Sequence, residues 1–121
     1  MGYESRLYVV EKCNTTENVN GKSLKWAEVV AMIDLCKCYP VSDKMRKYPE
    51  TDAFFYDSAD KKVTEDLYGE PLREIPLSDA IQIVGQAMES GYYRRYEPAM
   101  GLLKGFNADD WGDLVVLHYG H

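Results

Sequence analysis

The chain has 121 residues, of which 45% are hydrophobic and 28% charged, and its formal net charge is −6. This length suits one domain over residues 1–121, and no apolar run approaches the roughly 20 residues that cross a bilayer. The acidic balance disfavours nucleic acid as a partner, while the odd number of cysteines and a start without a secretory signal favour a soluble protein of the bacterial host cytoplasm.

The charge is distributed unevenly along the chain. Residues 1–49 hold eight Lys or Arg against six Asp or Glu, whereas residues 50–121 hold six against fourteen. Nine carboxylates but only three cations fall between Glu50 and Asp79. Net charge bears on association and solubility, so this pattern favours binding to a partner with a basic surface.

The first part of the chain predicts strands. Glu4–Cys13 is rich in β-branched and aromatic residues, as in a strand buried on both faces. Residues 14–23 hold four Asn or Gly without apolar periodicity and predict a loop. Leu24–Cys38 fits helical spacing and also a buried strand; the strand is favoured because Val29 and Val30 are β-branched.

The middle of the chain predicts a short helix and an acidic hairpin. Ser42 is a suitable N-cap for helical turns over Asp43–Lys47, between two prolines. Asp52–Tyr56 is strand-like, residues 57–60 have turn chemistry, and Lys61–Glu65 is the expected returning strand.

The last part predicts two helices. Ser78–Ser90 has an apolar stripe, an N-capping serine, and Gly91 as a stop signal. A second helix is expected to begin near Glu97, because proline at position 98 suits the first turn. Its expected apolar stripe is Ala99, Leu102, Leu103 and Phe106. Gly101 and Gly105 weaken this helix, and we expect close packing against a neighbour to compensate.

Asp113–Tyr119 is predicted as a final buried strand. Strands and helices cluster instead of alternating, which favours the α+β class. The predicted fold is a mostly antiparallel sheet of about four to five strands, with two helices from the C-terminal half packed on one face.

The sequence contains no recognisable catalytic, metal or cofactor motif. Cys36 and Cys38 are separated by one residue, closer than paired zinc ligands, so neither a metal nor another cofactor is expected. His118 is the only interior candidate for a general base, and a hydrogen-bonded sheet histidine is the favoured interpretation. The alternative is a small enzyme or ligand-binding domain with a pocket near His118, Tyr119, Arg94 and Arg95.

Two clusters are candidate binding sites. The first is the acidic hairpin, with Asp57, Asp60, Glu65 and Asp66. The second is an aromatic and basic loop whose residue types stack on bases or bind anions, although an inter-helix loop that covers the core is favoured; it comprises Tyr92, Tyr93, Arg94, Arg95 and Tyr96.

Several segments together resemble small proteins of unknown function from phages and prophages of Gram-positive gut bacteria. These segments are Gly2–Val10, Ser42–Pro49, Leu102–Asn107 and Val115–Tyr119. The resemblance brings no catalytic residues; it implies a non-catalytic factor that binds a host protein, with anti-CRISPR-like inhibition of host defence as one expected role. A symmetric homodimer stays open under every interpretation.

Overall fold

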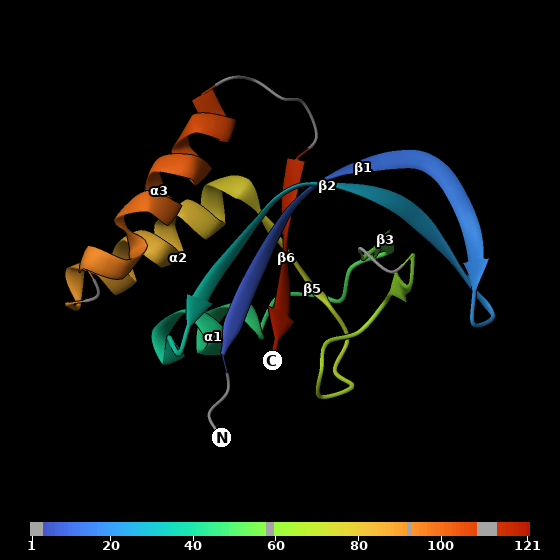
Figure 1. Ribbon diagram of the computed structural model, residues 1–121, viewed down its shortest axis with the longest axis horizontal. Coiled ribbons are helices and arrows are strands. Elements are labelled where there is room, and N and C mark those ends of the chain that lie inside the picture. Colours follow the sequence, from blue (N-terminus) through green and yellow to red (C-terminus); the bar gives the residue numbers. More distant parts are fainter. Residues whose placement is uncertain (1–3, 58–59, 92, 109–113) are drawn as a thin grey trace.

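A long curved hairpin of two strands is the framework of the fold (Figure 1). The computed structural model describes residues 4–57, 60–91, 93–108 and 114–121, and for residues 93–95 and 108 it describes the backbone alone. Strands β1 (Ser5–Val19) and β2 (Lys22–Cys36) pair antiparallel along their length. In β1, residues 13–15 form an irregularity opposite Trp26, and the hairpin bends there.

The turn of this hairpin corrects the predicted loop over residues 14–23. Asn20 and Gly21 have φ of 53° and 82°, the combination of positive values that a tight two-residue hairpin turn requires. The Gly21 amide also donates to Asn18 Oδ1 at 3.0 Å. The predicted loop is therefore two strand ends and their turn, whereas the predicted strand over Leu24–Cys38 is confirmed up to Cys36, where β2 ends.

The sheet has six strands in the order β4-β3-β2-β1-β6-β5. The α+β class is confirmed, but the sheet is larger than predicted and mixed, because β3 runs parallel to β2. β1 pairs antiparallel with β6, so the first and last strands lie side by side at the centre. The remaining strands are β3 (Ala53–Tyr56), β4 (Lys62–Val63), β5 (Arg73–Pro76) and β6 (Leu114–Gly120).

Three helices cover one face of the sheet: α1 (Tyr39–Met45), α2 (Leu77–Glu89) and α3 (Tyr93–Ala108). The main core lies between them and alternate residues of the central strands, such as Leu7, Val9 and Val116. The opposite face carries a smaller core in which Val10 and Leu117 pack with Phe55 of β3 and Leu72. Among the described residues, no helix is long and apolar enough to span a membrane.

The helix boundaries correct several expectations. α1 begins at Tyr39 with Pro40 in its first turn, and the Ser42 hydroxyl donates to the Tyr39 carbonyl instead of capping the helix. α2 confirms the predicted helix and ends before Gly91, whose φ is 110°, although its N-cap position is Pro76 and not Ser78.

α3 starts earlier than predicted, so Pro98 lies inside it. The buried Tyr96 explains this start, because its hydroxyl donates to the Leu35 carbonyl at 3.0 Å and fixes the first helical turns against β2. Of the predicted apolar stripe, Ala99 and Leu103 are buried, whereas Leu102 is 41% exposed. A Cβ added at Gly101 or Gly105 would meet none of the described residues within 4 Å, so the expected close packing is wrong for the part of the chain that the structure describes.

Candidate functional site

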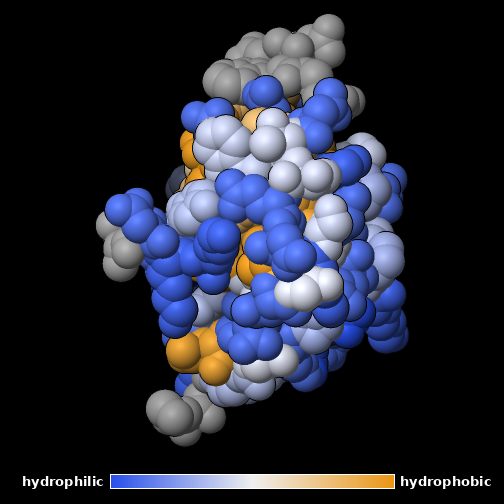
Figure 2. Space-filling view, turned by 90° about the vertical axis from the view of Figure 1, so that its right-hand side faces the viewer, coloured by the Kyte–Doolittle hydropathy of each residue, from blue (hydrophilic) through white to orange (hydrophobic). Residues whose placement is uncertain are grey.

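The predicted acidic hairpin exists, and its tip is exposed. β3 and β4 pair through Phe55 with Val63 and Tyr56 with Lys62. The Asp57 carboxylate accepts a hydrogen bond from the Lys61 amide at 3.1 Å, which closes the turn. Figure 2 shows the end of the molecule that includes this region, and hydrophilic side chains cover most of that face.

Asp66 does not belong to the exposed surface. The residue is only 7% exposed. Its Oδ1 accepts hydrogen bonds from the backbone amides of Tyr68 at 2.8 Å and Glu70 at 3.0 Å. These bonds hold the turn that follows the hairpin. Asp66 therefore stabilises this turn and is not available to a partner. The other three predicted binding carboxylates, Asp57, Asp60 and Glu65, are exposed.

Much of the acidic segment is neutralised within the fold. Lys12 of β1 lies 2.6 Å from the Asp52 carboxylate and 3.0 Å from that of Glu74. Arg46 pairs with Glu70 at 2.9 Å. The N-terminal cations thus meet the acids of residues 50–74, and the uneven charge along the sequence becomes local charge complementarity in the structure.

The pKa values of the Lys12 group follow from these contacts. Burial lowers the pKa of Lys12, but hydrogen bonds to Asp52 and Glu74 outweigh it and the net pKa is raised. The hydrogen bond from Lys12 lowers the pKa of Asp52. Both shifts favour the charged pair at neutral pH.

Other carboxylates of the acidic segment are exposed at the hairpin turn and on the chain that leaves it. Among the described residues, neither Asp60 nor Glu65 has a cation within ion-pair distance, and Lys62 pairs instead with Glu17 at 3.2 Å. Asp60 has a φ of 59°, a conformation that Asp and Asn tolerate better than other residues. We call Asp57, Asp60 and Glu65 the acidic tip.

The predicted aromatic and basic loop is wrong as a loop, because α3 begins at Tyr93, and its side chains are only partly described. Tyr92 and the side chains of Tyr93, Arg94 and Arg95 lie outside the described residues. Tyr96 is fully buried and hydrogen-bonded to the Leu35 carbonyl. Tyr96 therefore anchors α3 to β2 and offers no ring for stacking.

His118 and Tyr119 lie on opposite faces of the sheet. His118 is on the helix-covered face, 2% exposed, and its Nε2 is 2.9 Å from the Ser5 hydroxyl in a buried hydrogen bond. Burial, with a smaller contribution from the Arg46 charge, lowers the pKa of His118 to about 4. Tyr119 packs edge-on against Tyr8 on the other face.

The Ser5–His118 pair is closed off from solvent. A Ser–His pair performs nucleophilic catalysis only where substrate reaches the hydroxyl. Ser5 and His118 are both buried, and neither lines the two grooves beside the acidic hairpin. Among the described residues, no group of three or more His, Cys, Asp or Glu side chains is placed to hold a metal ion.

Shallow grooves border the acidic hairpin. One of about 400 Å³ lies between Asp57, Lys61 and Glu65 on one side and Leu67 and Tyr119 on the other. Another, of about 370 Å³, lies between the β1–β2 turn and the segment from Thr64 to Pro71. Their linings mix charges of both signs with apolar side chains, and both grooves are open to solvent, which suits a protein surface better than an enclosed small-molecule site.

One exposed feature escaped the sequence analysis. Met32, on β2, is 52% exposed in the middle of the apolar run Val29–Ile33. The run predicts a buried strand, and nothing in it signals that one edge of this strand lacks a neighbour. Trp26, at the point where β3 joins β2, is exposed as well.

Fold and site together define a small α+β domain with an acidic, grooved end. Comparisons with family models, with curated proteins and with solved structures found no match to this chain.

Proposed function

We propose that this protein is a non-catalytic binding factor that docks on a basic surface of another protein through its acidic tip. The observation that carries the proposal is that Asp60 and Glu65 keep exposed carboxylates beyond ion-pair reach of every described cation, while Asp52, Glu70 and Glu74 are neutralised by Lys12 and Arg46. Unpaired exposed charge of one sign steers encounter with an oppositely charged partner.

The expected biological setting comes from the resemblance to small phage and prophage proteins. In that setting the basic partner is a protein of the bacterial host, and inhibition of a host-defence system in the manner of an anti-CRISPR protein is the proposed role. The cytoplasm of the host cell is the proposed location. Nucleic acid is disfavoured as a partner because the net charge is −6.

The test is capture from a bacterial lysate with tagged protein at low and high salt, after nuclease treatment. The tip variant combines Asp57→Asn, Asp60→Asn and Glu65→Gln, which removes three charges but keeps the Asp57 hydrogen bond to Lys61 and suits the positive φ of residue 60. The matched control, Asp43→Asn with Glu89→Gln and Glu97→Gln, removes three exposed charges from the helices.

We expect the wild type and the control variant to retain one protein that salt releases, and the tip variant to retain at least about tenfold less. Equal unfolding temperatures of the variants establish that the fold is intact. Equal capture by the tip and control variants would refute the proposal, and so would capture that does not weaken with salt.

A further inference from the structure

β2 has an open edge over most of its length. β3 pairs with β2 only at Lys25 and Trp26 and then turns away to pair with β4. From Ala27 to Asp34, β2 has β1 on one side and, in the part of the chain that the structure describes, no strand on the other. Beyond this stretch, the Tyr96 hydroxyl binds the Leu35 carbonyl. We call Ala27–Asp34 the β2 edge.

The β2 edge lacks most of the features that protect edge strands from pairing. Such strands usually carry lysine or proline, or are very short. This one has eight residues without Lys, Arg or Pro, and Met32 at its centre is exposed. One bulge, in which Val30 has no partner on β1, leaves Ala31–Asp34 as a regular stretch. An exposed apolar edge of this kind is a template for an added strand.

The charges beside the edge indicate what the added strand carries. Glu28 lies directly opposite Glu11 of β1, and both are exposed. Like charges that face each other across two strands repel, and no described cation lies within ion-pair distance of either. Asp34 is exposed at the other end, although Arg6 lies 4.0 Å and His121 3.7 Å away. A lysine or arginine near Glu28 would relieve the repulsion.

The same charges argue against a second copy of this chain as the occupant. An antiparallel pair of β2 edges centred on Ala31 would place Glu28 of each chain opposite Asp34 of the other. Each chain also brings a net charge of −6. Like charges directly opposite each other destabilise strand pairing, so self-association is disfavoured.

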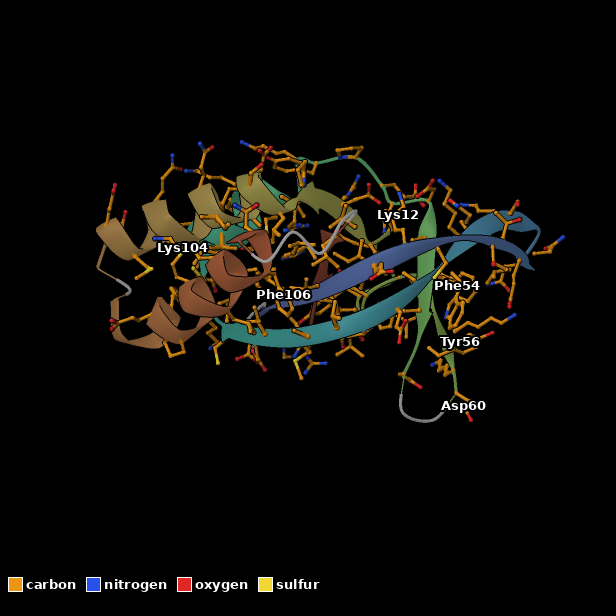
Figure 3. The ribbon with its side chains drawn as sticks, turned by 90° about the horizontal axis from the view of Figure 1, so that it is seen from above. Lys12, Phe54, Tyr56, Asp60, Lys104 and Phe106 are labelled. Atoms are coloured by element: carbon orange, nitrogen blue, oxygen red, sulfur yellow. The ribbon has the colours of Figure 1, made fainter. Side chains whose placement is uncertain are left out.

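We infer that the β2 edge accepts an extended segment of the partner protein as an additional strand, with apolar side chains in its centre and Lys or Arg at its ends. This inference rests on the proposed function and names the kind of segment that binds. Figure 3 shows Asp60 at the far end of the β3–β4 hairpin, and this hairpin joins β2 at Trp26, the residue just before the β2 edge. Both surfaces then meet one basic partner.

Synthetic peptides test the β2 edge without knowledge of the partner. The probe is an end-capped peptide with lysine at both ends and alternating Thr and Val between them. One control peptide has glutamate at both ends, and another has proline in its centre, which removes a donor from the added ladder. The readouts are the affinity and the protection of backbone amides in β2 from hydrogen exchange, a direct sign of new ladder bonds.

The protein variants are Glu28→Lys on the β2 edge and Glu89→Lys at the end of α2, which change the net charge equally. We expect the lysine peptide to protect amides within Ala27–Asp34, with both control peptides at least about tenfold weaker. Glu28→Lys should lower the affinity for the lysine peptide by a similar factor, and Glu89→Lys should leave this affinity unchanged. Glu28→Lys also removes the repulsion with Glu11, so its unfolding temperature should not fall.

Absence of amide protection by the lysine peptide at millimolar concentration would overturn the inference, as would equal weakening by both variants. Sedimentation of the wild type as a dimer that Glu28→Lys tightens and Glu89→Lys does not would overturn it too, because the occupant would then be a second copy. If the lysine peptide does not bind while the acidic tip still captures a partner, only the inference about the β2 edge is refuted. Loss of the tip result alone would refute only the proposed function.

Discussion

At the residue scale, His118 connects stability to pH. Its imidazole is buried on the helix-covered face, bonded to Ser5, and its pKa is lowered from 6.5 to about 4. Because the folded state disfavours the charged form, the unfolded state binds the proton first as pH falls. The contribution of His118 to the free energy of unfolding is therefore fully present above the pKa of the unfolded state. It is lost as the pH falls towards the pKa of the folded state.

We expect His118 to account for a loss of about 3 kcal/mol in the free energy of unfolding between about pH 7 and about pH 4. The comparison is urea unfolding of the wild type and of His118→Gln, which cannot take up the proton. The difference in free energy of unfolding between the two proteins should narrow as the pH falls. Parallel pH dependences for the two proteins would mean that His118 does not titrate in this window.

Lys12 and Lys22 form a second pair of tests at this scale. The Lys12 side chain is 18% exposed and joins Asp52 to Glu74 at short distances, whereas Lys22 is 70% exposed and lies 3.8 Å from Glu50. We expect Lys12→Met to lower the free energy of unfolding by about 2 kcal/mol, since charge-assisted bonds are lost and two carboxylates are left close together. Lys22→Met should change it by less than about 0.5 kcal/mol. Chemical denaturation measures both changes in the free energy of unfolding. Similar losses would show that the Lys12 contacts stabilise the fold no more than the exposed Lys22–Glu50 pair does.

At the element scale, replacing glycine by alanine is expected to have opposite effects on stability in different elements. Gly21 has a φ of 82° in the β1–β2 turn, whereas Gly101 is exposed on α3, and a Cβ added there would meet none of the described residues within 4 Å. A side chain strains the first position and improves helix propensity at the second.

Gly21→Ala should therefore destabilise the protein by about 1–2 kcal/mol, and Gly101→Ala should stabilise it by about 0.5–1 kcal/mol. Thermal unfolding of the two variants beside the wild type gives the signs. A stabilising Gly21→Ala would argue against the positive φ, and a destabilising Gly101→Ala would indicate a close neighbour at that position.

The sequence predicted elements whose signals are local. The helix before Gly91, the acidic hairpin and the final strand depend on capping, turn residues and apolar runs that lie within a few positions. The Asn20-Gly21 turn was also readable from its dipeptide and was missed because the flanking residues are polar.

Other features depend on tertiary contacts and were not predictable from these patterns. The early start of α3 follows from the bond between Tyr96 and Leu35, residues far apart in the sequence. The partnership of Ser5 with His118 follows from the pairing of β1 with β6, which lie near opposite ends of the sequence. The open β2 edge is likewise a property of the whole sheet.

At the scale of the whole molecule, charge and the β2 edge act together on solubility. The isoelectric point is about 4.9, so net charge vanishes in the pH range in which protonation of His118 destabilises the fold. Loss of net charge removes the repulsion that keeps exposed apolar edges apart. Aggregation near this pH should therefore proceed through β2.

We expect turbidity to peak near pH 5 in the wild type and to be suppressed in Met32→Lys, because lysine on an edge strand hinders pairing. Leu102→Lys is the matched control, since it adds the same charge at another exposed apolar residue, on α3. Light scattering across pH distinguishes them. Equal suppression by both variants would assign the effect to net charge alone.

The central pairing of β1 with β6 also has a consequence for folding during synthesis. The β1–β2 hairpin is local and forms early, but the strand that completes the centre of the sheet is the last element described. Contacts of such high sequence separation slow folding. While the ribosome still holds β6, the nascent chain exposes two edges of its hairpin, and this is the interval in which a chaperone would have the most to bind.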